Sequence, residues 1–341
     1  MSKGKILVTG GCGYIGSHTV VDLLDNGYDV VSIDSNIRSK ALTTERIKSI
    51  TGKEVKNYAV DLCDKEATKQ ALLAEGKIDG IIHFAALKSV PESVQKPALY
   101  YRNNINSLVN LLELANELQI KNFVFSSSCS VYGNTKQLPV TEDTPFGEAE
   151  SPYARTKQMG ENITADYSKV SDGKYVLLRY FNPVGAHESG KLGEDTTDVI
   201  TAMVPRITGT AIGKYKSFTV FGKDYPTRDG TCVRDYIHVM DIAHAHTNAI
   251  EYLLAGKQQQ ACDVYNLGTG NGVTILEAIE SFERTSGEKL NYALGERRDG
   301  DVIAIYANNN KAVNQLGWHI KRDLDTMMRT AWAWEKVLAK Q

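Results

Sequence analysis

The chain has 341 residues, of which 42% are hydrophobic and 23% charged, and its formal net charge at pH 7 is −2. This length predicts about two domains, each large enough to bury its own core. The near-neutral charge excludes the broad basic surface that nucleic acids and anionic membranes require, so any bound phosphate must be held by a few local cations.

The cysteines and the N-terminal residues indicate a compartment. Five cysteines are widely spaced and form no C-x-x-C pair, which argues against a disulfide framework and a zinc site and fits a reducing environment. The first apolar run covers only residues 6–8, too short for the core of a signal peptide, and no run of about 18 apolar residues occurs. We therefore expect a cytoplasmic protein that does not enter a membrane.

The first half of the sequence alternates short apolar runs with stretches of helical periodicity. This alternation predicts a parallel sheet that is covered by helices on both faces. We expect strands at residues 5–9, 28–33, 56–60, 80–84 and 122–126, and helices at 17–26, 65–74 and 104–118.

The pattern changes near Pro183, where polar, glycine-rich loops begin. Isolated strands are expected at 217–221 and 264–267, and a last helix at 324–340. The sequence therefore predicts an α/β protein with a Rossmann-type, doubly wound parallel sheet in residues 1–182. A smaller α/β substrate domain follows in residues 183–341.

A glycine-rich turn follows the first predicted strand. Residues 9–16 have the sequence TGGCGYIG, which fits G-x-G-x-x-G as well as the looser spacing of Gly10, Gly13 and Gly16. Glycine permits the tight turn and the close approach of a pyrophosphate, and the next helix, beginning near Tyr14 and Ile15, directs unpaired N–H groups at that anion. The turn predicts a dinucleotide site.

Acidic and small residues at later strand ends extend this site. Asp34 lies 18 residues after Gly16, where a carboxylate accepts the ribose hydroxyls of NAD and repels the 2′-phosphate of NADP. NAD is therefore the predicted cofactor, although Arg38 is near enough to leave NADP open. Further cofactor contacts are expected at the ends of the next two strands, from Asp61, Leu62, Phe84, Ala85 and Lys88.

A tyrosine, a lysine and a run of serines form the candidate catalytic group. Tyr153 and Lys157 are four residues apart behind a proline, so they are expected on one face of a helix. The pKa of a phenol is near 10, and a neighbouring ammonium together with a cationic nicotinamide would lower it toward neutrality. Ser126 and Ser128 end a strand at the carboxyl edge of the sheet, where such sheets bind ligands.

With these residues in place, the chain is similar to the extended short-chain dehydrogenases/reductases and, within them, to the UDP-galactose 4-epimerases. The resemblance lies in five segments that run in order through nearly the whole chain. They are VTGGCGYIGSH (8–18), HFAALKSVPESVQK (83–96), NFVFSSSCSVYG (122–133), LRYFNPVGAH (178–187) and VRDYIHVMD (233–241).

The resemblance implies a reaction and a role for each site residue. Tyr153 would be the base at the sugar 4′-hydroxyl, Ser128 its partner, and Lys157 the group that modulates Tyr153 and holds the nicotinamide ribose. The sugar would be oxidised at C4 by bound NAD, turned as a 4-keto sugar and reduced on its other face. Asn103, Tyr180 and Pro183 would contact the cofactor, and Lys88, Asn182, Phe221, Arg234, Arg298, Asp301 and Ile305 the UDP-hexose.

Two departures from the family pattern affect the substrate. The family often has Asn-Asn-Leu where this chain has residues 201–203, Thr-Ala-Met, so a polar contact to the nucleotide is missing or moved. The position whose size is linked to tolerance of N-acetyl sugars is Ile305, which is intermediate in size. Use of UDP-N-acetylglucosamine and UDP-N-acetylgalactosamine therefore stays open.

Two alternative functions are weighed against an epimerase. A nucleotide-sugar 4,6-dehydratase would need an acid beside the strand-end hydroxyl, but residues 128–130 are Ser-Cys-Ser. An inactive NAD-sensing protein would be expected to lack Tyr153 or Lys157, and both are present.

The remaining candidate residues, three histidines and one cysteine, are interpreted as packing residues and not as metal ligands or nucleophiles. His244 and His246 diverge by about 200° on a helix, so a metal site that combines them with His238 is not expected. Cys129 is interpreted as a small buried thiol. Relatives form dimers through the helix at 104–118 and the Tyr153 helix, so a homodimer is implied by resemblance.

Overall fold

The computed structural model describes residues 2–195, 197, 200, 202–297 and 302–341. Its centre is a seven-stranded sheet in which every neighbouring pair of strands is parallel. The strands lie in the order β11 (Cys262–Leu267), β6 (Lys174–Tyr180), β5 (Asn122–Ser128), β4 (Gly80–His83), β1 (Lys5–Thr9), β2 (Asp29–Ile33) and β3 (Lys56–Tyr58).

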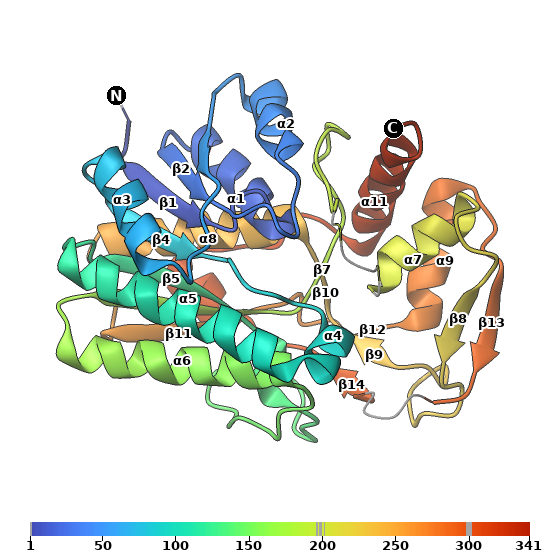
Figure 1. Ribbon diagram of the computed structural model, residues 1–341. Helices are drawn as coiled ribbons and strands as arrows, with labels where there is room; N and C mark the ends of the chain where they lie inside the picture. Colours follow the sequence, from blue (N-terminus) through green and yellow to red (C-terminus); the bar gives the residue numbers. More distant parts are fainter. Residues whose placement is uncertain (1, 196, 198–199, 201, 298–301) are drawn as a thin grey trace.

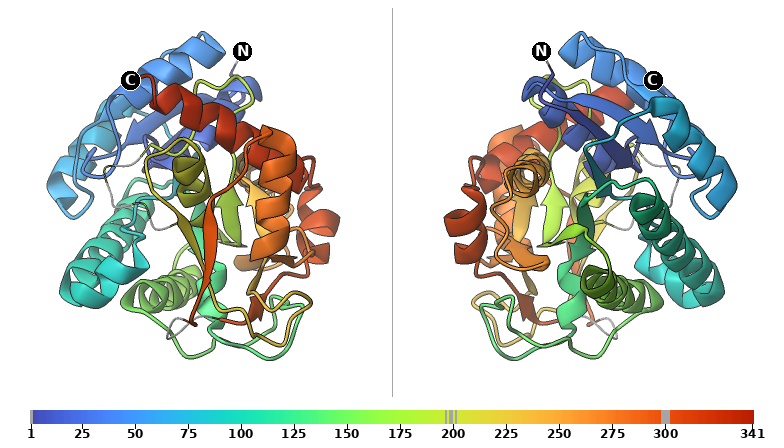
Figure 2. Two further views of the ribbon diagram at one scale, coloured as in Figure 1. Left: turned by 90° about the vertical axis from the view of Figure 1, so that its right-hand side faces the viewer. Right: turned by 90° about the vertical axis from the view of Figure 1, so that its left-hand side faces the viewer.

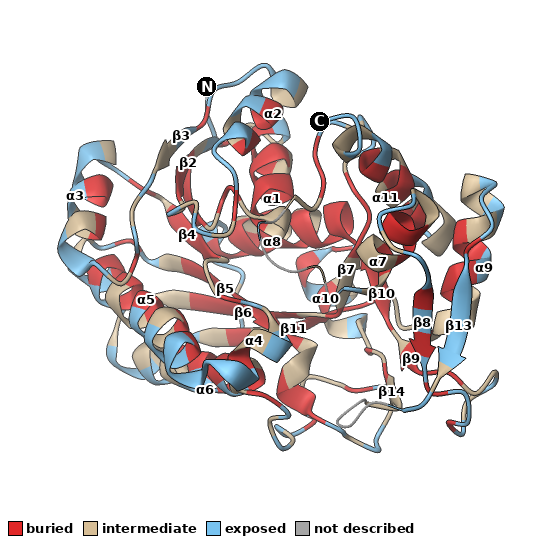
Figure 3. Ribbon diagram, turned by 45° about the vertical axis from the view of Figure 1, so that its right-hand side comes forward, coloured by how far each residue is buried: buried red, intermediate tan, exposed pale blue. Residues whose placement is uncertain are grey.

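Helices cover both faces of this sheet (Figures 1 and 2). One face packs on α1 (Tyr14–Asp25), α2 (Leu42–Thr51) and α8 (Val239–Leu254). The other packs on α3 (Lys65–Glu75), α5 (Pro97–Glu117) and α6 (Pro152–Val170). Buried residues concentrate in the sheet and in the helix surfaces that face it (Figure 3). The predicted α/β fold with a doubly wound parallel sheet is confirmed.

A smaller group of elements lies at the carboxyl side of the sheet, around its own core. It contains the strand pairs β7 (Asn182–Val184) with β10 (Tyr236–His238) and β8 (Phe218–Phe221) with β13 (Tyr292–Gly295), and the three strands β12 (Val273–Thr274), β9 (Val233–Arg234) and β14 (Ala304–Ile305). Its helices include α7 (Met203–Ala211), α9 (Ile275–Ser286) and α11 (Leu324–Leu338). The shorter helices of the chain are α4 (Val90–Gln95), η1 (Cys129–Tyr132) and α10 (Asn310–Leu316).

The chain does not divide simply at residue 182. Strand β11 pairs with β6 along six residues and so extends the first domain's sheet, and α8 packs against α1 on one face of that sheet. The boundary between residues 182 and 183 stays a prediction. Among the described residues, no helix combines the length and the apolar character needed to cross a bilayer.

Candidate active site

The glycine-rich turn joins β1 to α1 through close backbone contacts. Gly10 has a φ of +70°, and a Cβ on Gly16 would lie 2.1 Å from the carbonyl oxygen of Gly10. Gly13 is the N-cap of α1 and provides no side-chain hydrogen bond, so no side chain of the cap covers the amides at Tyr14 and Ile15. The turn is therefore a glycine-lined cradle at the positive end of a helix, which suits a pyrophosphate.

The carboxylate of Asp34 is fixed at the end of β2 beside this turn. Its Oδ2 accepts from the Cys12 amide at 3.0 Å, and its Oδ1 accepts from the Asn36 amide and the Ser39 hydroxyl, each at 2.9 Å. The carboxylate is thus held by the glycine loop itself, where the ribose of a dinucleotide would lie. Arg38 is turned elsewhere, because its Nη2 donates to both carboxylate oxygens of Glu92 at 2.9 and 3.0 Å.

The other predicted cofactor residues line the same edge of the sheet. Phe84 and Ala85 follow β4 directly and are half-buried, while Leu62 is buried and Asp61 exposed beyond β3. A Cβ on Gly10 would lie 2.9 Å from the Ala85 amide, so the turns after β1 and β4 are in contact.

Two further predicted residues are engaged with neighbours on the loops and helices that border the turn. Lys88 forms an ion pair of 2.7 Å with Glu194, and the side-chain Nδ2 of Asn103 donates to the side-chain Oδ1 of Asn104 at 3.0 Å. Asn104 also bonds both backbone groups of Leu87 and donates to Thr156 on α6, so it ties the loop after β4 to the Tyr153 helix.

The three candidate catalytic residues converge where β5 ends and α6 begins. Ser151 caps α6 by accepting from the Ala154 amide at 3.1 Å, and Pro152 occupies the first helical position, which places Tyr153 and Lys157 on one face. Ser128 ends β5 beside Tyr153, and its hydroxyl counteracts the rise in the pKa of that phenol. The Lys157 ammonium lies 5.9 Å from the centroid of the Tyr153 ring and donates to the Ser126 carbonyl oxygen at 2.6 Å.

Burial is the main cause of the pKa shifts of Tyr153 and Lys157. It raises the pKa of Tyr153 to about 12, although the hydrogen bond from Ser128 lowers it, and it lowers the pKa of Lys157 to about 8, against the raising effect of Glu161. The lowering of the Tyr153 pKa that we expected is therefore not a property of the chain alone. It requires the positive charge of a bound nicotinamide ring beside the phenol.

The predicted substrate residues lie on the smaller group of strands. Arg234 stands between Val273 and Ile305 in the sheet, and its Nη1 donates to the carbonyl oxygens of Val233 at 2.9 Å and Val302 at 2.6 Å. Among the described residues, the Oδ1 atom of Asn182 is one of the few buried side-chain oxygens without a hydrogen-bond partner. An unpartnered buried amide oxygen of this kind is suited to receive a ligand hydroxyl or amide.

The remaining predicted residues of this group are placed as follows. Phe221 ends β8 and is 39% exposed, whereas Ile305 is buried against Val131 and Phe181. Tyr180 ends β6, with Pro183 three residues further in β7. Arg298 and Asp301 lie outside the described residues.

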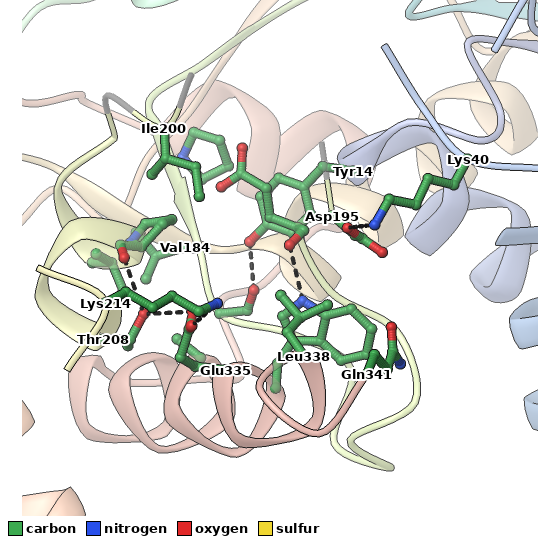
Figure 4. Close-up of a pocket in the computed structure, with 17 residues that line it drawn as sticks. Tyr14, Lys40, Val184, Asp195, Ile200, Thr208, Lys214, Glu335, Leu338 and Gln341 are labelled. Carbon is green, nitrogen blue, oxygen red and sulfur yellow. Dashed lines mark hydrogen bonds and ion pairs between the residues drawn. The ribbon is translucent and has the colours of Figure 1, made fainter. Parts of the chain in front are cut away.

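A separate cavity of about 420 Å³ lies between α7, α11 and Tyr14 (Figure 4). Pro183 lines it too, but Tyr153, Ser128 and Lys157 do not. Two pairs of its charged side chains form ion pairs within the lining, Lys40 with Asp195 at 2.6 Å and Lys214 with Glu335 at 2.5 Å. The cavity therefore borders the glycine turn without reaching the catalytic group.

Comparison with known proteins decides the family. A family model described as GDP-mannose 4,6-dehydratase matches residues 7–331. The UDP-glucose 4-epimerase of Bacillus subtilis (strain 168) is 46% identical over 331 residues, which cover 97% of this chain and 96% of that relative. The chain belongs to the UDP-glucose 4-epimerase family.

Solved structures of such epimerases agree with this chain over almost its whole length. The Bifidobacterium longum enzyme, in complex with NAD+ and UDP, has a TM-score of 0.92 and 44% identity, with 98% of each chain covered. The Stenotrophomonas maltophila enzyme, with bound NAD and formylated UDP-arabinopyranose, has a TM-score of 0.95 and 41% identity, with 99% of each chain covered. The resemblance to the epimerases drawn from the sequence motifs is confirmed.

The histidines of this epimerase have separate partners. His238 contacts the Thr330 hydroxyl at 3.1 Å, His244 lies 3.4 Å from an Asp22 carboxylate oxygen, and His246 contacts the Ser126 hydroxyl at 2.9 Å. Among the described residues no group of three His, Cys, Asp or Glu side chains could hold a metal ion.

Sequence reasoning missed the residues that support the catalytic group of this epimerase. His246 reaches Ser126 from α8, and Glu161 reaches Ser127 from α6. The spacing of Tyr153, Lys157 and Glu161, at intervals of four, was a usable signal for one helical face. No local signal pointed to His246, because it lies 120 residues from Ser126 in the sequence.

Proposed function

We propose that Tyr153, Ser128 and Lys157 carry out the interconversion of UDP-glucose and UDP-galactose that defines this family. The observation that carries the proposal is their convergence at the carboxyl end of β5, the sheet edge at which β1 and β2 also end in the glycine cradle and Asp34. The cradle fits NAD, because a side chain at Gly16 would fill it and because Asp34 favours free ribose hydroxyls. A dinucleotide held by this cradle and Asp34 would supply the acceptor, and later the donor, of the hydride at C4 of the sugar.

The protein residues handle the proton and the position of the sugar. The Tyr153 phenolate takes the proton of the C4 hydroxyl and, as the phenol, gives it back, while the Ser128 hydroxyl bonds to that oxygen in both states. Lys157 supplies a positive charge that favours the phenolate. Arg234 and the amide of Asn182 are assigned to the diphosphate, Phe221 to the uracil, and Lys88 to the cofactor and the sugar.

The assay that tests this function uses UDP-glucose without added NAD. The expected product is UDP-galactose, because the cofactor is regenerated in each cycle. A lasting keto sugar would instead indicate a 4,6-dehydratase, which the Ser-Cys-Ser sequence at 128–130 disfavours, and no product would indicate an NAD-sensing protein.

Replacing Asp34 with alanine is expected to weaken NAD binding by about tenfold or more, because hydrogen bonds from the ribose to a charged acceptor are lost. NADP should gain relative to NAD, since no carboxylate then repels its 2′-phosphate. Titration of cofactor-free protein with each dinucleotide measures both effects. Asp25→Ala, which removes an exposed carboxylate from α1, is the matched control. Unchanged NAD affinity in Asp34→Ala would contradict the assignment.

Replacing Ile305 with tyrosine is expected to lower turnover of UDP-N-acetylglucosamine about tenfold more than turnover of UDP-glucose, because the larger ring takes space that an N-acetyl group needs. Ile305 neighbours Arg234 in the sheet, which places it at the edge of the assigned substrate site. Rates for the two substrates, measured with both proteins, check this. If both rates stay unchanged in the variant, Ile305 does not shape the sugar pocket.

We also propose an oligomeric state, a pathway and a cellular compartment for the protein. Helices α5 and α6 lie side by side and expose apolar side chains, namely Leu99, Tyr101 and Met159, which supports a homodimer through this surface. Light scattering should then give twice the mass of one chain. The reaction suits galactose metabolism, and five free cysteines suit the cytoplasm.

A further inference from the structure

The side chain of Glu161 is buried where α6 crosses the end of β5. It is 3% exposed, and the Arg179 guanidinium donates to it through Nε at 2.9 Å and Nη2 at 2.7 Å. The Ser127 hydroxyl donates a short hydrogen bond to the same carboxylate. One carboxylate therefore joins three elements: α6, which carries it, β5 and β6.

Further hydrogen bonds hold Arg179 in place. Its Nη1 donates to the Tyr132 hydroxyl oxygen at 3.0 Å and to the Glu142 carbonyl oxygen at 3.2 Å, and the Tyr132 hydroxyl donates to Asn266 at 2.6 Å. A buried ion pair whose groups are all bonded has one low-energy arrangement. The network thus fixes Glu161 relative to η1 and β11 as well.

This arrangement controls the catalytic group from both sides. Ser127 lies between Ser126, whose carbonyl oxygen accepts from Lys157, and Ser128, whose hydroxyl counteracts the rise in the pKa of Tyr153. The side chains of Ser126 and Ser127 point to opposite faces of the sheet, toward His246 on α8 and Glu161 on α6. The strand end is therefore anchored on both faces, and Ser128 is the next residue.

We propose that Glu161 is a positioning residue for epimerisation, which through Ser127 fixes the end of β5 against α6 and sets the separation of the Ser128 hydroxyl and the Tyr153 phenol. This role rests on the proposed function of Tyr153 and Ser128. Displacement by about 1 Å at a reacting group can cost about a hundredfold in rate, so a single anchoring bond is enough to affect turnover.

Glu161 also influences the charge of Lys157, one helical turn before it. The other titratable groups around Lys157 are Tyr153 on its own helix, His83 on β4 and, through Ser126, His246 on α8. Burial lowers the pKa of His83 to about 3 and that of His246 to about 4, so both rings are neutral at neutral pH. The Glu161 carboxylate is the negative charge that raises the pKa of Lys157 against burial.

The first test replaces Ser127 with alanine, which removes the link to β5 and leaves the ion pair of Glu161 with Arg179 intact. The expected result is a kcat about tenfold lower, with the KM for UDP-glucose within about twofold of wild type and normal NAD content. Ser281→Ala is the matched control, because Ser281 is also buried and donates to a carboxylate, Asp325, which bonds an arginine. The Tm of the control should fall by a similar amount, and its kcat should stay unchanged.

The second test replaces Glu161 with glutamine. Without the carboxylate the pKa of Lys157 falls further, so the alkaline limb of the kcat profile, where the ammonium is lost, should move to lower pH. If this variant fails to fold, because Arg179 is left buried without a counter-charge, the comparison of Ser127→Ala with Ser281→Ala decides.

The outcomes separate this inference from the proposed function. Equal kcat values in Ser127→Ala and Ser281→Ala overturn the positioning role, as does a fall in kcat that only follows loss of bound NAD. An unshifted alkaline limb in folded Glu161→Gln overturns the effect on Lys157. If wild type itself forms no UDP-galactose, the proposed function is what fails.

Discussion

Tyr153→Phe is expected to lower kcat for UDP-glucose by about 10³-fold and to leave the bound NAD unchanged. The substitution removes only the phenol oxygen, which is the atom assigned to carry the C4 proton, and general acid–base catalysis contributes about 10²–10⁴-fold. The ring keeps its place in the first turn of α6, so the fold and the cofactor site are preserved. Turnover and the NAD released on denaturation are the two measurements.

A second tyrosine supplies the control for this variant. Tyr252 is buried and its hydroxyl donates to Asp263 at 3.0 Å, so Tyr252→Phe loses a comparable hydrogen bond away from the site. We expect that variant to keep its kcat. Substantial activity in Tyr153→Phe would rule out the phenolate mechanism, because Tyr153 is the group assigned to take the proton.

Gly16→Ala is expected to abolish stable NAD binding, with the NAD content of the purified protein falling at least about tenfold. The new Cβ would lie 2.1 Å from a backbone oxygen, that of Gly10, so the loop must move rather than a side chain. A displaced loop no longer brings its amides to the pyrophosphate. Turnover should fall with the NAD content.

Gly52→Ala separates this effect from general loss of stability. Gly52 ends α2 with a φ of +72°, so alanine is strained there, but nothing lies within 4 Å of the new Cβ. This control should lose stability and keep its NAD. Normal NAD content in Gly16→Ala would mean that the turn does not hold the pyrophosphate.

The local parts of the fold followed from the sequence because their signals are local. Strand β1 has the predicted bounds, since an apolar run ends at glycines on one side and polar residues lie on the other. Helix α5 begins at Pro97, earlier than predicted, because Leu99 and Tyr101 in its first turns are exposed and so do not follow the spacing of the buried face. The pairing of β11 with β6 joins residues about 90 apart, and no local pattern encodes such a contact.

The residues of the candidate site also fall into two groups, those with a local sequence signal and those without one. The glycine turn, Asp34 and the Tyr153–Lys157 pair could be predicted because each depends on spacing within one or two elements. The Glu161–Arg179 pair and the contact of His246 with Ser126 could not, because each partner is an ordinary polar residue until the sheet brings it to the other. A buried polar group needs a partner, but the sequence does not say which one.

Because β11 and α8 are supplied by the second half of the chain, neither half is an autonomous folding unit. A fragment ending at residue 182 would leave β6 as an unpaired edge strand and would remove α8 from one side of α1. Such a fragment should aggregate instead of binding a dinucleotide. We also expect little hinge bending between the sheet and the smaller group of elements, because the chain passes between them several times.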